Sequence, residues 1–177
     1  GLASNQSFQN NASKKGILVD QIYGKWSPLH TADWKGSLAF GKLEDPFEFS
    51  QLGVGMGLGI DPDYTPEGGA LQLEYKPAQD HTLRWINGAF ILDEISASSS
   101  DPYFVGTQLR LDSKWSRHVS SSVGVMPLSF SNVDKLSNGS VPNANLGNTR
   151  YLPSGTNQAN GIPLYDFNPI LADASLT

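Results

Sequence analysis

Few side chains of this 177-residue chain have the types and spacing that catalysis or metal binding requires. A zinc site brings several N or S ligands together, whereas the three histidines stand singly, two of them in predicted turns: His30, His81 and His118. Cysteine is absent, which excludes a structural zinc finger, an iron–sulfur site and a disulfide scaffold. No Gly-x-Ser-x-Gly sequence marks a catalytic serine. We therefore expect no enzyme activity, no metal site and no cofactor.

Acidic side chains gather in the stretch GIDPDYTPEGG, where Asp61, Asp63 and Glu67 could offer oxygen ligands to Ca²⁺. Their spacing differs from that of an EF-hand loop, so a solvated acidic turn is the simpler interpretation. The net charge of −5 and the single short basic pair, Lys14-Lys15, argue against a nucleic-acid partner.

Two-residue periodicity, rather than helical periodicity, runs along the chain, as in amphipathic strands. Apolar and polar residues alternate in WKGSLAFGK, GALQLEYK, YFVGTQLRLDSKW and HVSSSVGVM, and less clearly in VDQIYGKW. The stretch TLRWINGAFIL is apolar on both faces and is left unassigned, and a further strand is expected near YDFNPILADASLT. No run of about 18 apolar residues could form a membrane-spanning helix.

The connections between these strands alternate between short and long. The short ones are 27–33, 77–81 and 113–117, and the long ones are 43–68, 93–102 and 131–163. A transmembrane β-barrel has short turns on one side of the membrane and long loops on the other, and its strands span the bilayer with about ten residues. Aromatic residues also cluster toward the predicted strand ends, where interfacial girdles lie: Tyr23, Trp26, Trp34, Tyr75, Trp85, Tyr103, Phe104 and Trp115. A soluble antiparallel sandwich, whose strands also alternate, is the alternative.

The stretch QLGVGMGLGI, residues 51–60, has glycine at every second position. It does not match the Gly-x-Gly-x-x-Gly phosphate-binding pattern. Pro46 and Pro62 lie too close for the apolar 20-residue helix that a Gly-x-x-x-Gly packing motif needs. We predict an extended stretch that belongs to the long external connection rather than an additional membrane strand, since an additional strand would move every later long loop to the opposite side.

Several segments, in their order and spacing, resemble the bacterial putative-porin family of outer-membrane barrels. SNQSFQNNASKKGILVDQIYGKWSP followed by GSLAFGKLEDPF is similar to the family's aromatic-Lys-Trp-x-Pro strand and to its next strand, which ends in Gly-Lys/Arg-x-x-x-Pro-Phe. TPEGGALQLEYKP is similar to the family's Asn-Pro-Glu-Gly-x-Ala-Leu opening, with Thr65 where Asn is usual. GAFILDEISASSSDPYFVGTQLRLDSKW resembles the following hairpin. The resemblance covers residues 4–130 and, more faintly, 164–177.

The resemblance implies an all-β, antiparallel transmembrane barrel in the bacterial outer membrane. Residues 1–177 would be part of one such barrel, with 43–68, 93–102 and 131–163 as external loops. Family members are considerably longer and this chain opens on Gly1 rather than methionine, so we expect a processed chain or a fragment that supplies about six or seven strands. The expected partners are outer-membrane lipid and small hydrophilic solutes, with a homotrimer by analogy.

A porin acts through passive diffusion in a water-filled lumen whose polar side chains set its selectivity. Six residues on the predicted polar faces are expected to line that lumen: Lys25, Lys35, Glu74, Arg84, Arg110 and Asp112. For each, the alternative is a strand-end side chain that reaches the lipid headgroups. Two other functions stay open, namely a non-conducting barrel that acts as an anchor or adhesin and a soluble glycan-binding sandwich.

Overall fold

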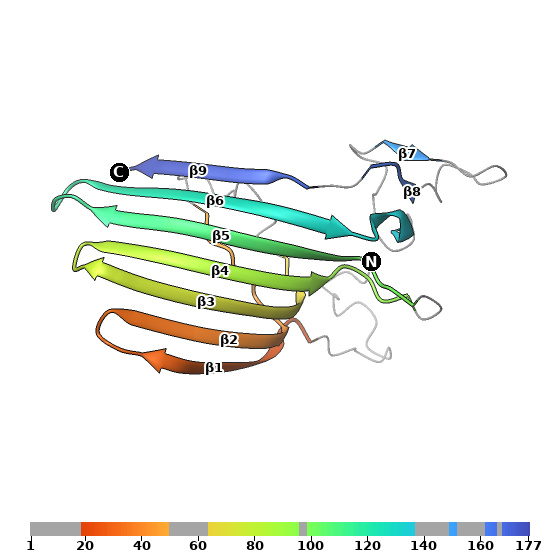
Figure 1. The fold of residues 1–177 in the computed structure, drawn as a ribbon, viewed down its shortest axis with the longest axis horizontal. Helices are drawn as coiled ribbons and strands as arrows, with labels where there is room; N and C mark the ends of the chain where they lie inside the picture. The colour runs from red at the N-terminus through yellow and green to blue at the C-terminus, as the bar shows by residue number, and fades with distance from the viewer. Residues whose placement is uncertain (1–18, 50–63, 96–98, 137–148, 152–161, 166–167) are drawn as a thin grey trace, which may run out of the picture.

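The computed structural model describes residues 19–49, 64–95, 99–136, 149–151, 162–165 and 168–177. Within these ranges seven strands form one antiparallel sheet in which the first six strands pair in chain order and the last strand pairs with the sixth (Figure 1). The strands are β1 (Ile22–His30), β2 (Trp34–Lys42), β3 (Glu67–Ala78), β4 (His81–Ile91), β5 (Tyr103–Lys114), β6 (Ser120–Ser131) and β9 (Ile170–Leu176). The all-β antiparallel part of the predicted fold is confirmed. In the described residues the sheet is open, because β1 and β9 form its two edges.

The connection between β6 and β9 carries further short elements. They are the 3₁₀ helix η1 (Val133–Lys135) and the two-stranded ladder of β7 (Arg150–Tyr151) with β8 (Ile162–Pro163). The three short connections of the sheet lie together at one end of the strands, and the three long ones leave from the other end (Figure 1). At the first short turn, the Trp34 N–H donates to Thr31 Oγ1 at 2.9 Å, which closes the chain tightly.

Two details of the strand prediction are corrected. The strand β1 continues to His30, so the first connection is shorter than the predicted 27–33. The unassigned stretch TLRWINGAFIL is almost entirely strand β4, which pairs along its whole length with β5. The glycine-alternating stretch 51–60 lies outside the described residues, and its predicted place in the external connection stays a prediction.

The sheet has two faces of opposite character, because alternate residues of a strand point to opposite sides. We call the face of Leu109 and Leu111 the outer face, and the face of Gln108 and Arg110 the inner face. On the outer face, 47% of Leu109 and 42% of Leu111 are exposed, whereas Gln108 is fully buried and only 7% of Arg110 is exposed. Exposed apolar residues extend over the outer face from β1 to β9: Trp26, Trp34, Trp85, Val105, Leu109, Leu111, Val123, Val125, Ile170 and Leu176. A water-soluble protein places these residue types inside.

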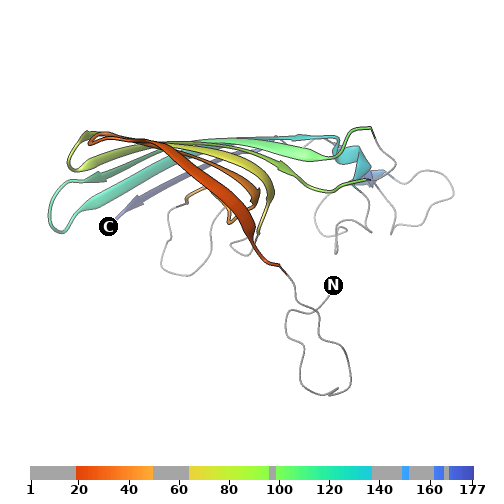
Figure 2. The ribbon, with the colours of Figure 1, turned by 90° about the horizontal axis from the view of Figure 1, so that it is seen from below.

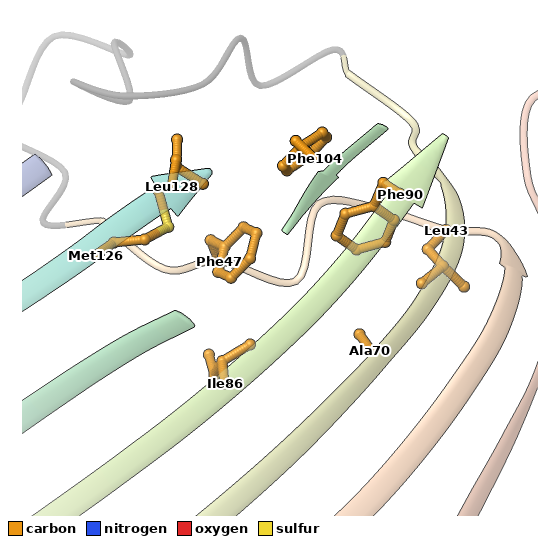
Figure 3. Close-up of a cluster of buried hydrophobic side chains, with 8 residues drawn as sticks. All are labelled: Leu43, Phe47, Ala70, Ile86, Phe90, Phe104, Met126 and Leu128. Carbon is orange, nitrogen blue, oxygen red and sulfur yellow. The ribbon is translucent and has the colours of Figure 1, made fainter. Parts of the chain in front are cut away.

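The inner face is buried because the chain folds back over it. After β2, residues 43–49 leave the sheet and cross its concave side (Figure 2). We call residues 43–49 the strap. Leu43 and Phe47 of the strap pack against apolar residues of β3 to β6, seen in Figure 3: Ala70, Ile86, Phe90, Phe104, Met126 and Leu128. The strap therefore explains why β4 is apolar on both faces: Ile86 and Phe90 face the strap.

Two glycines make room for the strap. Gly88 of β4 and Gly106 of β5 are register partners beneath Phe47. A Cβ atom on Gly106 would lie 2.6 Å from Phe47 Cζ and 2.8 Å from Leu128 Cδ2. Gly24 of β1, by contrast, has no atom within 4 Å of the position of its missing Cβ. The docking of the strap therefore requires that position 106 has no side chain, whereas position 24 has room for one.

We expect Gly106→Ala to loosen the strap, since overpacking a tight site typically costs about 1–3 kcal/mol. Limited chymotrypsin digestion of the folded protein should then cut after Phe47 or Phe49 faster than in the wild type. The matched control, Gly24→Ala, should leave the cleavage rate unchanged. Equal rates in Gly106→Ala and wild type would contradict the packing described for Phe47.

Candidate functional site

The six charged residues predicted on polar faces all lie on the inner face. They come from five consecutive strands: Lys25 from β1, Lys35 from β2, Glu74 from β3, Arg84 from β4, and Arg110 and Asp112 from β5. In the register, Lys35 pairs with Glu74, Glu74 pairs with Arg84, and Arg84 pairs with Arg110. The sheet thus brings together residues that are up to 87 positions apart (112 − 25 = 87). Whether they line a pore is not decided by this arrangement and stays a prediction.

Five of these six residues join one ion-pair network. Arg84 is its centre: its Nε lies 3.3 Å from Glu74 Oε2, its Nη1 lies 3.1 Å from Glu48 Oε2, and it also pairs with Asp112. Lys35 Nζ lies 3.3 Å from Glu74 Oε1. Arg84 and Arg110 are like charges on paired positions, which is unfavourable unless an anion lies between them. Asp112 supplies that anion, since its Oδ1 lies 3.1 Å from Arg110 Nε.

A second set of hydrogen bonds ties the strap to this network. Gln108 accepts the Glu48 N–H at 2.8 Å and donates through Nε2 to the Glu48 carbonyl at 2.6 Å. Arg110 Nη1 donates to the same carbonyl at 3.1 Å, and Gln72 Nε2 donates to the Pro46 carbonyl at 3.4 Å. A buried backbone amide needs such partners, because it has lost its hydrogen bonds to water. The side chain of Gln108 therefore satisfies both backbone groups of Glu48, as the backbone of a neighbouring strand would.

Three residues of the site were not among the six predicted ones. They are Glu48 of the strap, the clamping residue Gln108, and Asp173 of β9, whose Oδ2 lies 3.3 Å from Arg110 Nη1. Alternation carried a signal for two of them, since Gln108 and Asp173 stand at polar positions of their strands. Glu48 lies in a non-periodic segment, so no strand pattern could have indicated it.

A pocket of about 290 Å³ lies on the inner face beside the strap. Its polar lining includes Lys25, His30, Lys35, Glu48, Glu74 and Arg84. Lys25 is exposed and, within the described part of the chain, has no ion-pair partner. One side of the pocket is therefore formed by residues of the ion-pair network, and another side by the ammonium group of Lys25, which has no ion-pair partner there.

The strap also carries an unusual carboxyl group. Burial raises the pKa of Asp45 from its ordinary 3.8 to about 6; a hydrogen bond from the Phe47 N–H opposes this rise and the nearby charge of Glu44 adds to it. Burial raises the pKa of Tyr64 as well, with the charges of Asp45 and Glu67 adding to the effect. Asp45 can therefore change its charge near neutral pH while the strap stays docked.

The outer face carries aromatic pairs at the short-turn end. Trp34 and Tyr75 stack with their ring centroids 4.4 Å apart. His81 and Trp115 meet edge to face at 5.2 Å, and Trp115 Nε1 donates to Ser121 Oγ at 2.8 Å. These pairs lie near strand ends, as predicted, and their place in a membrane girdle stays a prediction. Four of the eight predicted members differ: Phe104 is buried on the inner face, Tyr23 shares the inner face with Lys25, and Trp26 and Trp85 lie in mid-strand.

Other kinds of site find no support in the described ranges. No three or more His, Cys, Asp or Glu side chains in them converge as metal ligands. None of the helices in these ranges is long and apolar enough to cross a membrane.

The raised pKa of Asp45 predicts that the strap is held more firmly at acidic pH. A carboxyl whose pKa is higher in the docked state binds extra protons there, so its stabilising effect is present below about pH 4 and is lost as the pH rises through about 6. Hydrogen–deuterium exchange of residues 43–49, corrected for intrinsic exchange rates, should show more protection at pH 5 than at pH 8. Asp45→Asn, which stays neutral, should remove this difference, and a difference that persists in the variant would assign it to another group.

Comparison with protein families adds an independent observation. The model of the family described as "Putative porin" matches residues 1–158. Comparisons with curated proteins and with solved structures gave no match. The match spans most of the chain and includes the six strands β1 to β6 together with the strap, and on this ground the chain belongs to the putative porin family.

Proposed function

We propose that this chain forms one side of an outer-membrane barrel through which small hydrophilic solutes diffuse passively. The observation that carries the proposal is the reversed burial of the two faces. Leu109, Leu111 and Val123 are exposed on the outer face, while Gln108 and Arg110 are buried on the inner one. Lipid favours such an outer face, and a polar lumen favours such an inner face. Membership of the putative porin family supports the same location and role.

The proposed barrel needs more strands than the described residues supply. Within the described residues, β1 and β9 each pair with a strand on one side only, so a row of their backbone groups points away from the sheet without a strand partner. In hydrocarbon each unpaired group costs several kcal/mol, so only a closed sheet can span the membrane. We propose that further strands of a longer polypeptide close the wall, with the long connections facing outside and with a trimer as the expected assembly.

The strap would narrow the lumen of this barrel. It covers the apolar half of the inner face on β3 to β6, and the pocket of about 290 Å³ stays open beside it. Water and solutes would then pass next to the accessible members of the six predicted pore-lining residues, such as Lys25 and Lys35, rather than across the whole lumen, since Arg110 is buried. The fixed charges there, partly neutralised in the Arg84 network, would set the selectivity.

Single-channel recording in planar bilayers tests the proposal on the full-length protein. The wild type should conduct, and Gln108→Leu should raise the conductance, because the Glu48 backbone loses two hydrogen bonds and the strap is released. The control, Gln79→Leu, alters an exposed turn residue and should leave conductance unchanged.

A correctly folded barrel that does not conduct would contradict the pore. That result would favour the non-conducting anchor or adhesin, for which the strap over half of the inner face is the relevant feature. A monodisperse, detergent-free preparation of the full-length protein would contradict the membrane location and favour a soluble sandwich.

A further inference from the structure

The pocket beside the strap has an uneven distribution of charge. Three cationic side chains line it, Lys25, Lys35 and Arg84, against two anionic ones, Glu48 and Glu74. Both carboxylates are already engaged. Arg84 lies 3.1 Å from Glu48 and 3.3 Å from Glu74, and Lys35 lies 3.3 Å from Glu74. Arg84 and Lys35 neutralise the negative charge of these two carboxylates, so it does not offset the charge of Lys25.

Lys25 is the cation that remains for a solute. It is exposed on the inner face of β1, and the described residues place no carboxylate within ion-pair distance of it. Lys35 contributes too, since 53% of its side chain stays exposed while it pairs with Glu74. Two hydroxyl groups, those of Ser27 and Ser37, line the same pocket. That of Ser27 can donate a hydrogen bond to an anion, whereas that of Ser37 donates to Gln72 Oε1 at 3.5 Å and would exchange this long hydrogen bond for one to the anion.

The acidic end of the strap lines the pocket on the other side of Lys25 and Ser37. Glu44 and Asp45 line a smaller neighbouring pocket of about 120 Å³, which also includes Lys25 and Ser37. Neither residue lines the larger pocket. An anion in the larger pocket would therefore meet Lys25, Lys35 and the two hydroxyl groups before it meets an unengaged carboxylate.

We propose that the larger pocket is a binding station for small oxyanions, of the carboxylate or phosphate class, and makes the pore prefer anions over cations. The inference rests on the proposed pore function. The ammonium group of Lys25 supplies the principal attraction, and Lys35, Ser27 and Ser37 complete the set of donors. The network of Arg84, Glu48 and Glu74 holds the shape of the pocket and carries a net charge of −1, which Lys35 balances, so Lys25 leaves the pocket with one positive charge.

The experiment uses the full-length protein in planar bilayers with a KCl gradient. The reversal potential should show that chloride is more permeant than potassium. Adding inorganic phosphate or succinate to one side should reduce the single-channel current, and comparing the two solutes distinguishes the phosphate from the carboxylate. Lys25→Gln should weaken this block about three- to fivefold, as expected when one exposed charge contact is lost. Lys25→Glu should move the reversal potential toward potassium preference.

Lys76→Gln is the matched control. Lys76 also carries one positive charge, is 41% exposed and pairs with Glu74 at 3.7 Å, but it does not line the pocket. It should change neither the block nor the reversal potential to the extent that Lys25→Gln does.

Failure of the inference is distinguishable from failure of the pore. An absence of channels would contradict the proposed function itself. Channels that prefer potassium, or whose selectivity and block are the same in wild type and Lys25→Glu, would overturn the anion station and leave the pore intact. Equal effects of Lys25→Gln and Lys76→Gln would contradict a binding site in the pocket and would attribute the anion preference to the overall charge of the inner face.

Discussion

Apolar side chains on the outer face have no covering layer in the described part of the chain, and the other features of the structure follow from this constraint. Leaving a Leu or Val side chain in water rather than burying it costs about 1.5–3 kcal/mol. Exposed apolar side chains of the outer face lie on β1, β2, β4, β5, β6 and β9, and those of β3 are half-buried. Hydrocarbon removes this cost. The same hydrocarbon would forbid unpaired backbone groups and exposed charges, so the charges must gather on the opposite face.

The inner face is divided between two different tasks. In its apolar half, Phe47 of the strap fills a space that Gly88 and Gly106 leave open. In its polar half, Arg84 binds the carboxylate of Glu48, and Arg110, which Asp112 links to Arg84, donates to the Glu48 carbonyl. The clamp at Gln108 stands where these halves meet, because it lies in the sheet and binds only backbone atoms of the strap. Packing and polar contacts thus secure the same short segment.

The sequence predicted the strands most securely where one face of the sheet is apolar and the other polar. The alternation in 103–114 is of this kind, and β5 covers the same residues. It did not predict β4, because Ile86 and Phe90 are covered by a segment from elsewhere in the chain, and strand periodicity reports only local burial. The alternation also placed six charged residues on one face, but it could not show which of them pair.

The non-local parts of the site were beyond such patterns. The return of the strap across the sheet depends on Phe47, on two distant glycines and on Gln108, which lies 60 positions after the residue it binds, Glu48. None of these residues has a distinctive spacing from the others. The alternation in ILADASL could have predicted that Asp173 lies on the inner face. The part of Glu48 in the ion-pair network, by contrast, follows only from the fold.

The central claim is that the outer face meets lipid and the inner face meets water. The chain has no cysteine, so single cysteines report their surroundings cleanly in it. In native outer membranes that contain the full-length protein, Leu109→Cys should react with a membrane-soluble maleimide and resist a charged thiol reagent. Ser37→Cys, which lies in the inner pocket, should react with the charged reagent. Labelling of Leu109→Cys by the charged reagent, or by neither reagent, would contradict the claim.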